Sequence, residues 1–212
     1  MGPRHLPELL EQRVAASGDA VALRSKKSGR WSAESWREWH DASRALSVAL
    51  IAAGLEKGDR VLLLSSTREE WCLIDFGILG AGAVTVPVYP AATAEQIGVI
   101  LENSGARRAF VETAAQLAEL GRSGAALGTL EDVVVIDPSA PLDPIPREGA
   151  PPIPVRRWLE ALREAGAAAA ATEASAQLDR RRASLCPDDL ATIVYTSGTT
   201  GVPRGAMLTH GA

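Results

Sequence analysis

The sequence predicts an α/β protein in which a mostly parallel β-sheet is covered by helices on both faces, with a short hairpin near the N-terminus. Three observations lead to this prediction. Short runs of almost entirely apolar residues recur along the chain, helix-like segments separate them at regular spacing, and 46% of the 212 residues are hydrophobic. Strands without a polar face are typical of parallel sheets, which are buried on both sides. The length suffices for one sizeable hydrophobic core.

The first expected element is a short hairpin. Residues 21–24 and Trp31 flank the sequence K-K-S-G-R. Because Gly29 can adopt the positive φ that a tight turn requires, this sequence is a natural connection between two antiparallel strands.

A helix is expected next, because the hydrophobic period changes to about 3.6 residues. Ser32 is a candidate N-cap, Glu34 would lie in the first turn, and Gly54 can end the helix in the left-handed conformation. The two tryptophans of this helix could form the wall of a site for an apolar ligand, but large apolar side chains on one helix face are more often core, and we favour core. The residues at helical spacing are Trp36, Trp39, Ser43, Leu46, Leu50 and Ala53.

The middle of the chain alternates between strand-like and helix-like segments. This alternation is the βαβ pattern of a parallel sheet. The strand-like runs are residues 61–64, 83–88, 108–111 and 133–136. The helix-like segments are residues 68–81, 94–103 and 114–120, and Ser104 and Gly105 close the second of them.

The last third of the chain begins with a proline-rich stretch. Residues 138–154 hold too many prolines for a regular element and are expected to form a surface connection. Residues 158–182 are expected to form a helix, with an alanine run at 167–171 that buries little. A strand is expected at residues 190–195, directly before a glycine-rich loop, and a second apolar strand at residues 206–208.

Charge and cysteine usage exclude several classes of function. The formal net charge is -4 and the basic residues are scattered, so we expect no nucleic-acid binding. Cys72 and Cys186 have no C-x-x-C motif or nearby histidine pair and are expected to be packed thiols in a reducing compartment. The N-terminus lacks a secretion signal, and Asp75, several glycines and Pro87 interrupt the apolar stretch 72–89. We expect a cytoplasmic protein, and attachment to a membrane surface stays open.

Residues 196–205 have the chemistry of a polyphosphate-binding loop. Four hydroxyl side chains and three glycines lie within these ten residues. Glycines let main-chain N–H groups approach a ligand, hydroxyls donate to phosphate oxygens, and an arginine can screen the charge that develops when pyrophosphate leaves. A hydroxyl in such a loop can also ligate Mg²⁺. The candidate binding residues are Thr196, Ser197, Gly198, Thr199, Thr200, Gly201 and Arg204.

Two other phosphate-binding loops do not fit this sequence. The nucleoside-triphosphatase loop, G-x-x-x-x-G-K-[ST], would need a glycine where Pro203 stands, five residues after Gly198, and the dinucleotide fingerprint G-x-G-x-x-G is absent. A solvent-exposed Ser/Thr/Gly linker is the plain alternative. Because a linker is seldom held between two apolar strands, we favour a binding loop.

The stretch from Tyr195 to His210, Y-T-S-G-T-T-G-V-P-R-G-A-M-L-T-H, resembles the signature of the adenylate-forming (AMP-binding) superfamily. This superfamily includes acyl-CoA synthetases, luciferases and nonribosomal peptide adenylation domains. Residues 68–90 and 94–107 are similar to the corresponding part of long-chain fatty acid:CoA ligases. The resemblance covers most of the chain, which is most like the N-terminal part of such a ligase.

The resemblance implies a two-step reaction in the full-length enzyme. A fatty acid carboxylate attacks the α-phosphate of Mg-ATP to give an acyl-adenylate and pyrophosphate, and the thiol of coenzyme A then displaces AMP. Because the carboxylate itself is the nucleophile, the enzyme's task is electrostatic and positional, and no catalytic side chain is assigned here. By the resemblance, Thr196 would contact Mg²⁺, and the β- and γ-phosphates would be held by Thr196, Ser197, Gly198, Thr199, Thr200 and Gly201.

Two residues depart from the family pattern. The family usually has lysine where Arg204 stands, and a planar guanidinium is not equivalent to an ammonium in a tight site, so reduced activity is expected. The family commonly continues T-H-x-N, and Ala212 stands where that asparagine is expected. In the family, the segments that bind adenine, ribose and the acyl group, and a C-terminal domain with a catalytic lysine, follow further along the chain.

Two hypotheses concern the whole protein. In the first, residues 1–212 are an incomplete N-terminal AMP-binding domain without its C-terminal domain, cut by an incomplete gene record or a cloning boundary and inactive alone. In the second, they are a short product that at most binds a nucleotide or a partner without turnover. We favour the first, because a sheet ending at the strand after the loop would leave an unprotected edge. Activation of an aryl or amino acid remains an alternative branch, and the sequence carries no signal for oligomeric state.

Other polar residues are interpreted as structural. His5 and His40 are expected at the surface. His210 is as consistent with a structural role at the start of a helix as with ligand contact. Glu69 and Glu70 adjoin at the expected solvated start of a helix, so we do not expect acid–base chemistry from them.

Overall fold

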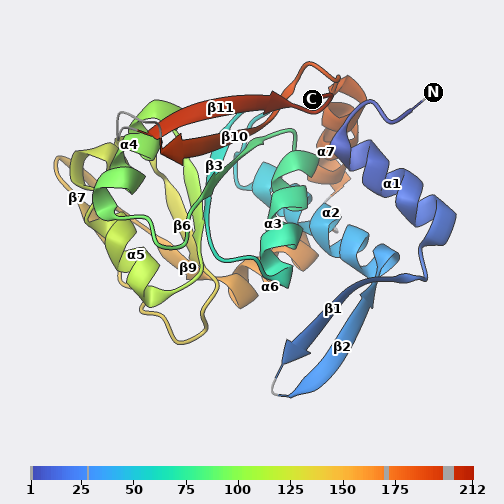
Figure 1. Ribbon diagram of the computed structural model, residues 1–212, viewed down its shortest axis with the longest axis horizontal. Coiled ribbons are helices and arrows are strands. Elements are labelled where there is room, and N and C mark those ends of the chain that lie inside the picture. Colours follow the sequence, from blue (N-terminus) through green and yellow to red (C-terminus); the bar gives the residue numbers. More distant parts are fainter. Residues whose placement is uncertain (1, 28, 170–171, 198–202) are drawn as a thin grey trace.

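The computed structural model describes residues 2–27, 29–169, 172–197 and 203–212. Within these residues the chain is built around a seven-stranded sheet (Figure 1) with the strand order β11-β10-β4-β3-β5-β6-β9. Neighbouring strands are parallel except for the pair β10 and β11, so the predicted mostly parallel sheet is confirmed. The strands are β3 (Arg60–Leu64), β4 (Val84–Val88), β5 (Arg108–Val111), β6 (Asp132–Val135), β9 (Val155–Arg157), β10 (Leu190–Ser197) and β11 (Pro203–Thr209).

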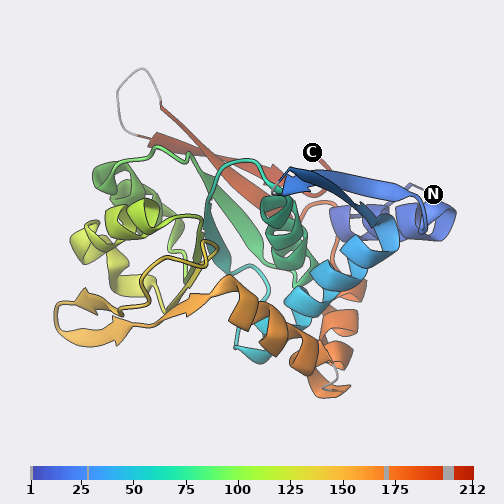
Figure 2. The ribbon, with the colours of Figure 1, turned by 90° about the horizontal axis from the view of Figure 1, so that it is seen from below.

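Helices cover both faces of the sheet, as Figure 2 shows. In strand β3, Leu62 and Leu64 belong to one hydrophobic cluster, while Val61 and Leu63 belong to a second cluster on the other face. All four side chains are fully buried, because successive residues of a strand point to opposite faces and both faces are covered. Helices α4 (Ala94–Ser104) and α5 (Ala114–Gly121) cover one face, and the other is covered by α2 (Trp36–Ala52), α3 (Glu69–Gly80), α6 (Trp158–Ala169) and α7 (Thr172–Ser184).

The alternation predicted for the middle of the chain is confirmed. Helix α4 starts with a capping box at Thr93 and ends at Gly105, whose φ of 60° is left-handed, as expected. Helix α5 begins with a second capping box at Thr113. A 3₁₀ helix, Gly124–Thr129, connects α5 to β6. These local signals explain why the predicted and observed boundaries agree closely in this part of the chain.

The N-terminal hairpin is confirmed, but the start of the following helix is not where we expected it. Strands β1 (Val21–Lys27) and β2 (Arg30–Ser35) pair antiparallel, and β2 includes Ser32 and Glu34. The N-cap is instead Ser35, whose hydroxyl accepts a hydrogen bond from the Glu38 amide, while the Glu38 carboxylate accepts one from the Ser35 amide. This capping box is reciprocal and therefore outcompetes the earlier serine. The stop at Gly54, with φ of 86°, is confirmed.

The expectation that residues 138–154 contain no regular element is wrong. Strands β7 (Ile145–Arg147) and β8 (Ala150–Ile153) form a small antiparallel pair that turns at Gly149, which has φ of 68°. Ile145 and Ile153 are paired and buried in the core. Proline is compatible with such strands because a two-stranded sheet has only edges, where a missing N–H donor does no harm. The next residues form β9, which the sequence did not reveal.

The helix predicted over residues 158–182 is present as α6 and α7, on either side of residues 170–171, which lie outside the described residues. A further helix, α1 (Leu6–Ser17), was not predicted. Cys72 is partly buried, and burial raises the pKa of its thiol. Cys186 is exposed, so the expectation that it is packed is wrong. In the described part of the chain, no helix combines the length and apolar character needed to cross a membrane.

Candidate functional site

The predicted binding loop leaves the sheet at the end of strand β10 and returns as β11. The apolar residues that precede it, Ala191, Ile193 and Tyr195, are buried, whereas Thr196 is exposed. Ser197 is the last residue of β10. The candidate residues at the tip of the loop lie outside the described residues, and they are Gly198, Thr199, Thr200 and Gly201.

The stem of the loop brings two of the predicted residues together. Thr196 pairs with Arg204, and Ser197 pairs with Pro203, in the antiparallel ladder between β10 and β11. Directly opposed residues of such a ladder lie on the same face, with Cβ atoms about 5 Å apart. The side chains of Thr196 and Arg204 therefore project from the same face at the base of the loop, and both residues are exposed.

The position of this stem in the sheet suits ligand binding. Strand β10 lies beside β4 and runs parallel to it, and the hydroxyl of Thr192 donates to the Thr85 carbonyl over 2.9 Å. The loop therefore lies at the edge of the sheet formed by the carboxyl ends of the parallel strands. In open α/β sheets this edge is where ligands bind.

A cavity of about 280 Å³ adjoins the stem. Its walls come from the end of β4, the start of α4 and the loop stem. The residues that line the cavity include Val88, Tyr89, Gln96, Tyr195, Thr196 and Pro203.

Tyr195 anchors the stem. Its hydroxyl donates to Oδ1 of Asn103 in α4 over 2.6 Å, and burial raises the pKa of the phenol. Across the ladder stands Gly205, where an added Cβ would lie 2.7 Å from Cγ2 of Ile193 and 3.0 Å from Cζ of Tyr195. Glycine at position 205 is therefore required for the packing of Ile193 and Tyr195. Only the strand register reveals this role.

The histidine of the motif is buried far from the loop. His210 follows Thr209, which pairs with Leu190 at the opposite end of the hairpin, and its side chain contacts His5 with ring centroids 6.1 Å apart. The structure thus favours a structural role for His210, and burial lowers its pKa.

The surface position expected for His5 is wrong. His5 is buried, with 4% of its surface exposed, and its Nδ1 accepts a hydrogen bond from the Glu8 amide as the N-cap of α1. His40 is only partly exposed, and its Nδ1 lies 2.9 Å from Asp41. A histidine at a helix start is hard to recognise as a cap, because serine, threonine, aspartate and asparagine are the usual ones.

The other side chains considered for chemistry have structural roles in the described residues. Trp39 lies in the core with its ring centroid 5.0 Å from that of Phe76, as predicted. Glu70 forms an ion pair of 2.7 Å with Arg68. Burial raises the pKa of Asp75, which accepts a hydrogen bond from Thr85 and so ties α3 to β4.

Comparison with known proteins identifies relatives of similar sequence. The long-chain-fatty-acid–CoA ligase FadD15 of Mycobacterium tuberculosis is 36% identical over 192 residues, which cover 91% of this chain and 29% of the relative. The human long-chain-fatty-acid–CoA ligase ACSBG2 is 26% identical over 214 residues, with 98% and 29% covered. The chain therefore spans less than a third of the length of these two relatives.

A solved structure has the same fold. The anthranilate CoA ligase AuaEII in complex with anthranoyl-AMP superposes with a TM-score of 0.71 at 21% identity, covering 100% of this chain and 36% of that one. The sequence profile of the AMP-binding enzyme family matches residues 10–212. The chain accordingly belongs to the AMP-binding enzyme family.

Proposed function

We propose that the loop beginning at Thr196 holds the polyphosphate of ATP, and that the whole protein is a long-chain fatty acid:CoA ligase. The observation that carries this proposal is the pairing of Thr196 with Arg204 at the carboxyl edge of the sheet. A hydroxyl donor and a cation at the base of a glycine-rich loop match the oxygens and the charge of a triphosphate. Residues 1–212 would be the N-terminal part of the enzyme, because the relatives named above are more than three times as long.

The proposed reaction has two steps. A fatty acid carboxylate attacks the α-phosphate of ATP, the bond to pyrophosphate breaks, and an acyl-adenylate forms. The thiol of coenzyme A then attacks the acyl carbon, loses its proton and releases AMP. In the first step Thr196 and Ser197, with residues 198–201, hold the β- and γ-phosphates, and Arg204 balances the charge that accumulates on pyrophosphate.

Magnesium fits this site through its donor chemistry. Mg²⁺ takes oxygen ligands and keeps several waters, and the exposed Thr196 side chain can supply one hydroxyl oxygen beside the phosphates. When bound, Mg²⁺ would neutralise part of the phosphate charge. In the described residues no group of three or more histidine, cysteine or carboxylate side chains could hold a metal by itself.

Attachment to a membrane surface is a further part of the proposal. Hairpin β1–β2 projects from the body of the protein (Figure 1), and Trp31 on it is 69% exposed. Nζ of Lys26 lies 5.9 Å from the centroid of the Trp31 ring. Tryptophan and lysine are both suited to the membrane–water interface. Weaker binding of Trp31→Ala to anionic vesicles is expected, and equal binding would remove this part of the proposal.

The substrate assignment is tested by ATP–pyrophosphate exchange with the full-length protein. We expect exchange that depends on palmitate. If an aryl acid or an amino acid supports exchange and palmitate does not, the long-chain assignment is wrong while ATP-dependent activation stands. If no acid supports exchange but ATP binds, the protein is a non-catalytic nucleotide binder. Arg204→Ala should lose exchange because the site needs a cation at this position, and Arg204→Lys should retain or raise it because lysine is the family's usual cation here.

A further inference from the structure

A second cavity lies at the opposite end of the sheet from the loop. It has a volume of about 240 Å³ and lies between helices α2 and α6 and strands β5 and β6. Arg108 and Asp132, which line it, are the first residues of β5 and β6. Because these strands run parallel to β10 through the sheet, the cavity is at the amino ends of the strands. It cannot be part of the proposed ATP site.

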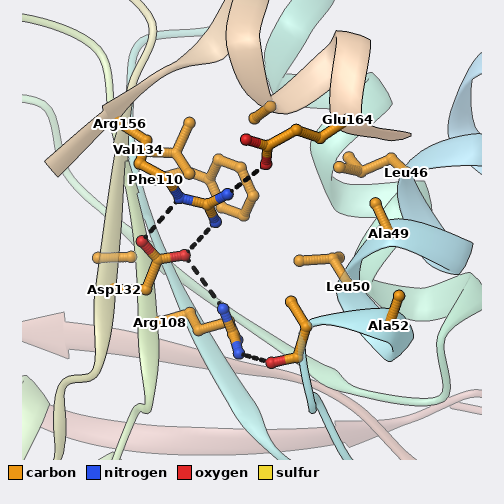
Figure 3. A pocket seen from close by; sticks show the side chains of 13 residues that line it. Leu46, Ala49, Leu50, Ala52, Arg108, Phe110, Asp132, Val134, Arg156 and Glu164 are labelled. Carbon is orange, nitrogen blue, oxygen red and sulfur yellow. Dashed lines mark hydrogen bonds and ion pairs between the residues drawn. The ribbon is translucent and has the colours of Figure 1, made fainter. Parts of the chain in front are cut away.

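One side of this cavity is apolar. Figure 3 shows Leu46, Ala49, Leu50 and Ala52 of α2 facing the sheet across the cavity. The alanines leave space that larger side chains would fill, and Phe110 and Val134 extend the apolar surface on the sheet side. A hydrocarbon chain placed here would be removed from water, which stabilises binding by about 0.8 kcal/mol for each methylene group.

The other side of the cavity is a charged cluster (Figure 3). Nη1 of Arg108 donates to Oδ2 of Asp132 over 3.0 Å, and Nε of Arg156 donates to Oδ1 of Asp132 over 3.1 Å. The side chains of Arg108 and Asp132 are only 9% and 10% exposed. Two guanidinium groups thus share one buried carboxylate, which leaves one positive charge to be balanced.

Glu164 supplies the balancing charge, and it is the exposed member of the cluster. Its Oε2 accepts a hydrogen bond of 2.6 Å from Nη1 of Arg156, but its side chain is 60% exposed. An exposed ion pair of this kind contributes little to stability, because water screens the two charges. A carboxylate from a ligand could therefore replace that of Glu164 on Arg156 at little cost.

We propose that this cavity binds a short carboxylic acid, whose carboxylate replaces that of Glu164 on Arg156 and whose hydrocarbon chain lies along α2. Nε and Nη2 of Arg156 both donate to Asp132, so the ligand carboxylate would accept a charged hydrogen bond from Nη1, which now donates to Glu164. The volume lies below the roughly 300 Å³ at which pockets for drug-sized ligands begin, so the ligand is an acid of about four to eight carbons.

The proposal is tested by titrating the full-length protein with a series of unbranched acids from butyrate to decanoate, followed by ligand-observed NMR. Affinity should rise about fourfold for each added methylene and then fall once the cavity is full. Hexan-1-ol should bind at least about tenfold more weakly than hexanoate, because it cannot form the charged pair with Arg156. Equal affinities for the acid and the alcohol would overturn the proposal, as would no saturable binding of any acid.

Variants of the charged cluster give opposite and specific effects. Arg156→Gln should weaken hexanoate binding by about tenfold or more. Glu164→Gln should strengthen it by about fivefold, because the competing carboxylate is gone. Glu160→Gln, one turn earlier on the exposed part of α6, is the matched control and should leave affinity unchanged. If Glu164→Gln binds no more tightly than the wild type, the exchange of carboxylates is wrong.

Variants of the apolar wall locate the binding site. Ala49→Leu should abolish hexanoate binding by filling the cavity, whereas Ala45→Leu, one turn earlier on α2 and outside the cavity lining, should not. Circular dichroism shows whether each variant is folded. The variants of Arg156 and Glu164 test the proposal independently of the two alanine variants. Thr196→Ala should leave hexanoate affinity unchanged, since the loop is at the other end of the sheet. A loss of binding in Thr196→Ala would assign the acid to the ATP site and overturn the proposal.

Discussion

The two ends of the parallel strands hold their polar residues in opposite ways. At the carboxyl end, Thr196 and Arg204 are exposed at the base of a glycine-rich loop. At the amino end, Arg108 and Asp132 are nearly buried and joined to each other, and only Glu164 is exposed. The carboxyl end can therefore meet a highly charged ligand directly. By the proposal above, the amino end can accept only a small ligand whose carboxylate replaces that of Glu164.

The largest effect is expected from breaking the cluster at the amino end. Asp132→Ala leaves the Arg108 guanidinium buried without its carboxylate, and removal of one partner of a buried ion pair costs about 3–5 kcal/mol. Urea denaturation followed by circular dichroism measures this change in the free energy of unfolding.

Glu164→Gln is the matched control for Asp132→Ala, because it removes an exposed member of the same cluster. It should change the free energy of unfolding by less than about 0.5 kcal/mol. If both variants lose a comparable free energy of unfolding, the two carboxylates contribute equally to stability. The burial of Asp132 would then not explain its contribution.

At the carboxyl end the effect should be on activity and not on stability. Thr196→Ala removes a hydroxyl expected to contact phosphate, and loss of one such donor lowers the rate about a hundredfold. Thr209→Ala, at the far end of the same hairpin, should retain full ATP–pyrophosphate exchange. The free energy of unfolding of both variants should stay within about 0.5 kcal/mol of the wild type. Normal exchange by Thr196→Ala would remove this residue from the site.

The packing of the loop stem gives an intermediate effect. Gly205→Ala places a methyl group 2.7 Å from Ile193, and overpacking of this kind costs about 1–3 kcal/mol. The unfolding midpoint in urea should fall accordingly. Gly128→Ala, which has no atom within 4 Å of the added methyl group, should be neutral or slightly stabilising. A neutral Gly205→Ala would mean that the Tyr195 ring can move aside.

The smallest effect is expected in the pH dependence of stability. Glu112 follows β5 at the carboxyl end of the sheet. Burial alone would raise the pKa of Glu112. Hydrogen bonds from Ser66 and the charge of Arg68 outweigh burial, so the pKa of Glu112 is lowered. A lowered pKa in the folded state stabilises the protein above the unfolded pKa of about 4.3, and this contribution is lost as the pH falls through the folded pKa.

Glu112→Gln should therefore be less stable than the wild type near neutral pH, and the difference should shrink as the pH falls below about 4. Urea midpoints measured for both proteins across this range provide the comparison. A difference that is independent of pH would show that Glu112 acts through hydrogen bonding alone.

Prediction from the sequence succeeded where local signals determine structure. The helices predicted at residues 94–103 and 114–120 and the stop at Gly105 depend on short-range features, and the nearly all-apolar β3 can only lie inside a parallel sheet. Prediction from the sequence failed where an element forms only because it pairs with a distant strand. Strand β9 is only three residues long and exists because it pairs with β6, more than 20 residues earlier. Neither its composition nor its period distinguishes it from a loop.

The candidate site shows the same division. The hydroxyls, glycines and arginine of the loop are visible in the sequence, and so is the resemblance to adenylate-forming enzymes. Of these residues, Thr196, Ser197 and Arg204 lie in the described stem, while residues 198–201 lie outside the described residues. Their contact with phosphate and that of Thr196 with Mg²⁺ remain predictions. The role of Gly205 required the register of β10 against β11.

By itself the sequence determined the α/β class, the order of most elements and the chemical character of the loop, because each of these depends on residues close together in the chain. The tertiary structure decided which distant residues meet. It placed β10 beside β4 and brought Arg108, Asp132 and Arg156 from three strands into one cluster. Such contacts follow from strand order and register, which the packing of the whole core selects and no short stretch of sequence encodes.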